Sequence, residues 1–254
     1  MSLKLIGIAT LILASLLFAV YAVKPFRRLL FPNPTFHSFV ASLVATFVGV
    51  YLAATVAQHD RMADSKTRTL RLLESTRCQV ESEAIAAHLT RRRILDPRLN
   101  PPDASPISEN LIRSQSIARL AEAMLRSELV LQHFEPGPAF RASANISGAL
   151  LSAETATKEE AAHAIAEHVA RLRNHFVNAS DILTVQVGLL SDRVTRQCAN
   201  VLFNALYRAY VEDALTIDEA IDQAKQINRE CAAFAEETLF LEFLEEGRLK
   251  KRCS

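Results

Sequence analysis

Two apolar stretches near the N-terminus decide how this chain is organised: Leu5–Val23, LIGIATLILASLLFAVYAV, and Ser38–Ala57, SFVASLVATFVGVYLAATVA. Neither contains a charged residue. A helix rises about 1.5 Å per residue and a hydrocarbon core is about 30 Å thick, so each stretch is long enough to cross a bilayer. Between them lie the basic run KPFRR at 24–28 and the run PNP at 32–34, which separate two helices. We therefore predict an N-terminal two-helix transmembrane hairpin.

A secretory signal peptide is the alternative interpretation of the first stretch, because Val20-Tyr21-Ala22 offers a small residue at a cleavage position. The preceding segment has only Lys4 as a cation, and the apolar run is longer than a usual signal-peptide core. Both features favour an uncleaved anchor. If cleavage occurred, Ser38–Ala57 would still span the membrane.

Positive charges near the two stretches predict the topology. The connecting loop holds three cations: Lys24, Arg27 and Arg28. The flanks on the other side hold six: Lys4, Arg61, Lys66, Arg68, Arg71 and Arg77. Because cytoplasmic flanks carry the excess of Lys and Arg, the count predicts a two-pass protein of the cell (inner) membrane with both termini in the cytoplasm.

Small residues recur every four positions in the second stretch. This small-residue stripe consists of Ala41, Ala45, Gly49, Ala53 and Ala57, and Ser42 and Thr46 lie beside it. Small side chains let another helix backbone approach closely, and hydroxyl groups can bond across such an interface. Two interpretations stay open: the stripe packs on the first helix of its own hairpin, or it mediates self-association.

The rest of the chain is predicted to be helical, so the fold class is all-α. We expect a transmembrane hairpin at 1–58, a long helical stalk at 59–95, a Pro-rich hinge at 96–108 and a C-terminal cytoplasmic helical bundle at 109–254. Residues 60–95 contain no Gly or Pro, and their apolar residues follow a 3,4 spacing. The second membrane helix is therefore expected to continue into the stalk until Pro97.

Within the bundle we expect a helix from Ser108 to about Phe134, then an ambiguous segment at 139–156 with one short helix around 146–151. Thr157-Lys158-Glu159-Glu160 has the pattern of a capping box for the next helix. Asn178-Ala179-Ser180-Asp181 is expected to interrupt or recap that helix, and a long helix is expected at 182–212. Thr216-Ile217-Asp218-Glu219 is a second capping box, before a last helix that ends at Glu246.

Composition excludes some functions. Outside the hairpin region the chain has 25 basic and 28 acidic residues, which is not the basic balance of a nucleic-acid-binding protein. The four cysteines, Cys78, Cys198, Cys231 and Cys253, form no CxxC pair. Free cysteines would suit a reducing cytosol, although the spacing also permits disulfides.

One polar cluster is a candidate metal site: Glu160, His163, Glu167, His168 and His175. A Glu-x-x-His step places a carboxylate and an imidazole on one helix face, and di-iron bundles use two such steps with two further glutamates. This chain has only one step, and Glu160 is also explained as a capping residue. We therefore assign no metal, no cofactor and no catalytic residue. Sequence motifs of serine hydrolases and of phosphate-binding loops are absent as well.

The layout of the chain resembles that of two-helix membrane effectors of bacterial defence systems, in the order and length of its segments. The leading hypothesis is a membrane-anchored, non-enzymatic helical interaction or scaffold protein that binds the bilayer and either a protein partner or further copies of itself. An assembling, membrane-perturbing effector is the alternative that the resemblance implies. A metal-dependent enzyme with a helical site around His163, His168 and His175 comes third.

Overall fold

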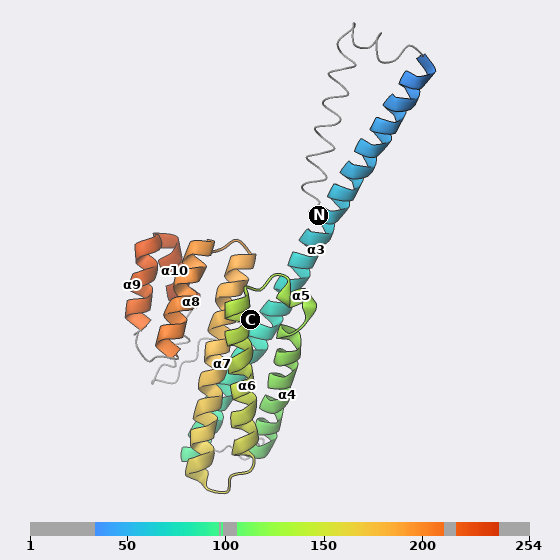
Figure 1. The fold of residues 1–254 in the computed structure, drawn as a ribbon. Coiled ribbons are helices and arrows are strands. Elements are labelled where there is room, and N and C mark those ends of the chain that lie inside the picture. The colour runs from blue at the N-terminus through green and yellow to red at the C-terminus, as the bar shows by residue number, and fades with distance from the viewer. Residues whose placement is uncertain (1–33, 97, 99–105, 211–216, 239–254) are drawn as a thin grey trace. The chain divides into compact units, whose positions relative to one another are not determined.

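The computed structural model describes residues 34–96, 98, 106–210 and 217–238, and all its regular elements are helices (Figure 1). No strand occurs among these residues, which confirms the all-α class. The predicted first membrane segment Leu5–Val23, most of the hinge at 96–108, Thr216 of the second capping box and the tail from residue 239 lie outside the described residues. The chain divides into two compact units, Met1–Ser65 and Lys66–Ser254.

The helix α3 (Pro34–Leu95, 62 residues) contains the second apolar stretch, and the boundary between the two units falls within it, after Ser65. It ends two residues before Pro97, as expected for a helix that nothing interrupts until a proline. The second stretch thus continues through residues 59–95 as one helix, of which residues 66–95 belong to the same unit as the bundle. Across the described residues, none of the helices combines the length and the apolarity needed to span a membrane.

A helical bundle forms the larger part of the second unit. It consists of residues 66–95 of α3, α4 (Ile107–Leu125), α6 (Pro136–Ala156) and α7 (Ala162–Leu190), with the short α5 (Glu128–Leu131) after α4. Its core is built from apolar residues at helical spacing: Leu73, Val80, Ala84 and Ala87 of α3 meet Leu111, Ala118, Ala121 and Leu125 of α4, Ile146 and Ala149 of α6, and Leu172 and Phe176 of α7. The apolar residues at 3,4 spacing that the sequence shows within residues 60–95 therefore contribute to this core.

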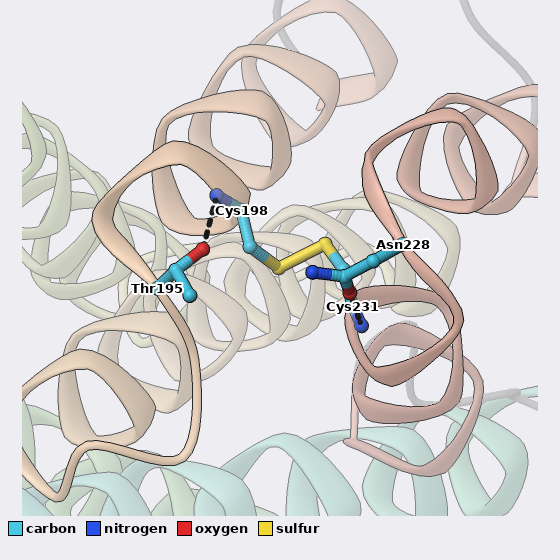
Figure 2. Close-up of a disulfide and its surroundings, with 4 residues drawn as sticks. All are labelled: Thr195, Cys198, Asn228 and Cys231. Atoms are coloured by element: carbon cyan, nitrogen blue, oxygen red, sulfur yellow. Dashed lines mark hydrogen bonds between the residues drawn. A yellow bond between two sulfur atoms is a disulfide. The ribbon is translucent and has the colours of Figure 1, made fainter.

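Three shorter helices follow in the described part of the second unit: α8 (Arg196–Tyr210), α9 (Ile217–Ile227) and α10 (Arg229–Thr238). A disulfide between Cys198 and Cys231 joins α8 to α10 (Figure 2). The side-chain oxygens of Thr195 and Asn228 accept the backbone N–H of Cys198 at 3.2 Å and of Cys231 at 2.7 Å. The two cysteines thus occupy equivalent places, each in the first turn of a helix with a side-chain cap three residues earlier.

Of the two possibilities that the sequence left open, free cysteines or disulfides, the described residues show disulfides. Cys198 and Cys231 are only 1% and 2% exposed, so the disulfide lies inside the three-helix part. Cys78 on α3 is disulfide-bonded too, and none of the described cysteines is free. Spacing alone could not reveal the Cys198–Cys231 pair, because 33 residues separate its members.

Helix α7 is the most enclosed element of the bundle. Eleven consecutive residues, Phe176–Gln186, are buried, so every side of the helix is covered over this range. Five of them are polar: Asn178, Ser180, Asp181, Thr184 and Gln186. The prediction that Asn178–Asp181 interrupts the helix is wrong, because α7 runs through it. Polar residues that favour a helix end in isolation are here held in mid-helix by tertiary packing.

Other predicted boundaries are wrong for local reasons. The helix expected to reach Phe134 breaks after Leu125, where Ser127 caps α5 by accepting the N–H of Val130. The segment at 139–156 is helical throughout, because Pro136 occupies the first turn of α6 rather than ending a structure. The predicted capping box at Thr157–Glu160 does not form, since α7 begins at Ala162 after Ala161 and no side chain caps it.

Two long helices expected toward the C-terminus are each divided. The helix expected at 182–212 ends at Leu190, and Asp192 adopts a left-handed conformation with φ 58° before α8 begins. The helix expected to run from Ile217 to Glu246 breaks at Asn228, whose side chain starts α10. An Asn or Asp tolerates the left-handed region and caps helices, so both breaks have an ordinary sequence cause.

Candidate functional site

A pocket of about 320 Å³ lies between α6, α7 and α8 of the bundle. Helix α7 runs between the other two (Figure 1), so the three together form its walls. Most of its lining is apolar, and a polar group stands at one side; the lining residues used below are Phe140, Arg141, Asn145, His175, Asn178 and Tyr207. Such a combination of an apolar body and a few polar groups is typical of small-molecule sites, and the volume is near the lower limit of their range.

Asn145 of α6 is the centre of the polar group. Its amide nitrogen donates to the carbonyl oxygen of Arg141 at 3.0 Å, one turn earlier. Its Oδ1 lies 3.3 Å from Nδ1 of His175 and 3.5 Å from Nδ2 of Asn178, both on α7. Oδ1 of Asn178 is buried and has no hydrogen-bond partner among the described residues. The group thus links α6 to α7 and contains an acceptor whose bonding capacity is unused.

His175 is held as a neutral ring. Burial lowers the pKa of His175 below its ordinary value, so the imidazole is uncharged at neutral pH. Nδ1 then carries the proton that is donated to Asn145. The ring also packs against Gly148 of α6, where an added Cβ would lie 2.7–2.9 Å from its atoms. A glycine at this point lets the imidazole approach the α6 backbone.

Arg141 provides the positive charge of the pocket. Its guanidinium carbon lies 4.2 Å from the centroid of the Tyr207 ring on α8, and its Nη1 donates to the carbonyl oxygen of Phe203 at 3.3 Å. None of the eleven lining residues is acidic, and no carboxylate among the described residues lies within 4 Å of Arg141. The stacked, half-buried cation is therefore oriented by the protein without being neutralised by it.

The structure disperses the polar cluster that the sequence suggested. Glu160 precedes α7 and is exposed, so the Glu-x-x-His step to His163 does not lie on one helix face. His163 and Glu167 pair at 3.4 Å on the exposed side of α7, and His168 is half-buried there. Only His175 reaches the pocket. No group of three or more His, Cys, Asp or Glu residues that could hold a metal ion occurs in the described part of the chain.

The small-residue stripe lies in the N-terminal half of α3. Ala45, Gly49, Ala53 and Ala57 are exposed, as are Ser42 and Thr46, while the side chain of Ala41 lies outside the described residues. A Cβ added at Gly49 would meet nothing within 4 Å among the described residues. The hydroxyl of Thr46 donates to the carbonyl oxygen of Ser42 at 2.8 Å, and Thr55 bonds Tyr51 in the same way. These hydroxyls are thus satisfied within their own helix.

A second hollow of about 310 Å³ borders the disulfide and is lined by polar residues of α8, α10 and the preceding turns, among them Arg193, Arg196, Asn228 and Glu230. Arg196 pairs with Glu135 at 3.3 Å, and the guanidinium of Arg193 lies 5.6 Å from the centroid of the Phe234 ring. Its arginines are engaged by the protein itself, which makes it the weaker candidate.

Sequence reasoning found His175 but missed Arg141, Asn145 and Asn178. The segment at 139–156 was not recognised as a continuous helix, so the face that carries Arg141 and Asn145 one turn apart could not be seen. Asn178 was interpreted as a helix interruption. Comparison of the chain with models of protein families, with curated proteins and with solved structures finds no match.

Proposed function

We propose that this chain is a membrane-anchored, non-enzymatic helical interaction protein whose α3 serves both as anchor and as a core helix of the bundle. One observation carries the proposal. Within the same 62-residue helix, residues 42–57 expose apolar and small side chains, whereas residues 73–87 bury theirs in the bundle core. Phe47 and Val50, for example, are 61% and 64% exposed.

An exposed apolar surface of this kind is expected to contact lipid or another protein chain, because large apolar patches on a protein mark such contacts. The absence of charge from Ser38 to Ala57 supports lipid as one of these contacts. The small-residue stripe supports a second helix as the other, since membrane helices associate where backbones approach closely. The partners proposed are therefore the bilayer together with another copy of the chain or a protein partner.

Two observations predict different sides of the membrane for the bundle: the count of positive charges and the disulfide. The six-to-three charge count favours the cytoplasm, whereas disulfides persist in oxidising compartments. A large domain can cross a membrane largely regardless of its flanking charge, but a reducing cytosol does not keep a structural disulfide. We give the disulfide more weight than the charge count. We therefore propose that both termini and the bundle lie outside the cytoplasm.

Gly49→Leu tests the anchor with Val50→Leu as the matched control. Both variants keep the segment apolar, so insertion should survive. Overpacking of a fitted interface costs about 1–3 kcal/mol, which weakens association by roughly one to two powers of ten. If the stripe mediates self-association, only Gly49→Leu shifts the detergent-solubilised protein to smaller particles in light scattering.

The same pair of variants separates the two interpretations of the stripe. If the stripe packs inside the hairpin, particle size stays constant and Gly49→Leu lowers thermal stability instead. Identical size and stability of both variants and the parent would remove the stripe as a basis for assembly. Membrane extraction provides a further check, because a chain that is released from membranes by high salt or alkali is not anchored as proposed.

A further inference from the structure

We propose that the pocket between α6, α7 and α8 binds a small monoanionic carboxylate with an apolar body, with Arg141 as the residue that recognises the carboxylate. The inference concerns the bundle and does not depend on the anchor. It follows from the charge, the size and the rigidity of the site.

The charge of the site favours an anion. Arg141 is the single charged group among the eleven lining residues, because burial keeps His175 neutral and no acid contributes to the walls. A half-buried cation without a counter-ion is costly, and an anionic ligand would relieve this cost. One cation matches one negative charge, which favours a monoanion over a dianion such as a phosphate monoester.

The geometry of Arg141 favours a carboxylate among the monoanions. A guanidinium has five N–H donors in a planar fork, and the structure shows only one of them used, toward the carbonyl oxygen of Phe203. Stacking on Tyr207 holds the plane of the fork and leaves its edge available. Two parallel N–H groups match the two oxygens of a carboxylate, which is the geometry that makes such pairs short and strong.

The remaining walls determine the rest of the ligand. Ile182, Leu206 and Phe203 provide an apolar floor, and Phe140, which is 75% exposed, stands at the mouth. The pocket volume of about 320 Å³ lies near the lower limit for small-molecule sites, which restricts the ligand to a small molecule. An aromatic or branched aliphatic acid of this size would fill it. The unpartnered Oδ1 of Asn178 shows that the polar wall is not fully satisfied by the protein alone.

The test uses the full-length protein in detergent and isothermal titration calorimetry with phenylacetate as the probe. Phenylacetamide has the same shape without the charge, and inorganic phosphate supplies negative charge without the apolar body. We expect phenylacetate to bind at least about tenfold more tightly than phenylacetamide, because the charged pair with Arg141 is lost in the amide. Phosphate should not compete.

Two variants with a matched control locate the site. Arg141→Gln should weaken phenylacetate binding by at least about tenfold and leave phenylacetamide binding unchanged. Ala144→Phe, at an exposed position of the lining, should block both probes by filling the mouth while the cation remains. Arg119→Gln removes an exposed surface cation of α4 and should have no effect. Circular dichroism shows that each variant is folded before titration.

Several results would overturn the proposal. Equal affinity for phenylacetate and phenylacetamide would show that the charge of Arg141 is not used. Competition by phosphate at similar concentrations would indicate an unspecific anion site. Unaltered binding in Ala144→Phe would place the ligand elsewhere, and absence of phenylacetate binding up to its solubility limit would exclude this class of ligand.

Discussion

Two half-buried histidines have their pKa values lowered by the fold, and they determine how the bundle responds to acid. Burial lowers the pKa of His175, and burial followed by the charges of Arg173, Arg92 and Arg91 lowers that of His88. In both cases the folded protein holds the proton less tightly than the unfolded chain, whose histidines titrate near 6.5. Between the folded and unfolded pKa values the unfolded state binds more protons, so stability falls as pH decreases below about 6.5.

We therefore expect the melting temperature of the solubilised protein to fall between about pH 7.5 and pH 5.5, and His175→Gln and His88→Gln each to reduce that fall. Circular dichroism melts at several pH values measure it. His163, which is exposed and faces Glu167, provides the control, because His163→Gln removes a histidine of the surface. An undiminished pH dependence in both His175→Gln and His88→Gln would contradict this assignment.

Glycine at 188 is explained by one close contact. A Cβ on Gly188 would lie 2.7 Å from Cζ of Phe234 and 3.3 Å from Cγ2 of Val194, so the Phe234 ring packs directly on the α7 backbone at this glycine. Gly188→Ala should lower the free energy of unfolding by about 1–3 kcal/mol through overpacking. Gly137→Ala is the matched control: nothing lies within 4 Å of its added Cβ, and alanine in a helix gains up to about 1 kcal/mol over glycine. Chemical denaturation of both variants measures the difference, and equal stability would disprove it.

At the level of helices, the Cys198–Cys231 bond is the covalent tie between α8 and α10. A crosslink stabilises mainly by restricting the unfolded chain, and a loop of this length corresponds to about 4 kcal/mol in the chain-entropy estimate. The double variant Cys198→Ala with Cys231→Ala should therefore unfold at lower denaturant concentration, with a loss of about 2–4 kcal/mol. Unchanged stability would mean that the two helices are held together by packing alone.

Helices whose own residues carry the information were predicted well. The apolar spacing of Leu73, Val80 and Ala84 and the absence of breakers before Pro97 sufficed for α3. Helix boundaries that depend on packing against other helices were not predicted well. Asn178 and Ser180 resemble a helix end in the sequence, but they lie inside α7 because the surrounding helices bury them. The helix caps Thr195 and Asn228 belong to the sequence patterns Thr-x-x-Cys and Asn-x-x-Cys. These patterns alone do not indicate that the two cysteines form a disulfide.

The candidate site was less predictable than the fold for the same reason. His175 stood out by residue type, yet its neighbours Asn145 and Arg141 come from a different helix and from a segment with no clear periodicity. Hydrogen bonds between α6 and α7 depend on the angle and register of two packed helices. No spacing along one chain segment encodes that register.

For the whole molecule, the disulfide predicts the side of the membrane on which the bundle lies. If the bundle lies outside the cytoplasm, as we propose, Lys158→Cys, at an exposed position between α6 and α7, should react with a membrane-impermeant maleimide in spheroplasts before lysis. The parent protein provides the background. Reaction only after lysis would return the bundle to the cytoplasmic side that the charge count favours.

The enclosure of α7 has a consequence for the way in which the bundle opens. Backbone amides exchange their hydrogens with solvent only when the structure around them opens, and the covered stretch Phe176–Gln186 has no outer face from which a partial opening could begin. Its amides should therefore be the slowest to take up deuterium, and their common rate should report the free energy of complete unfolding. Amides of α9 and α10 should exchange earlier and independently. Deuterium uptake would then distinguish a slowly exchanging group around Phe176–Gln186 from a faster one in α9 and α10.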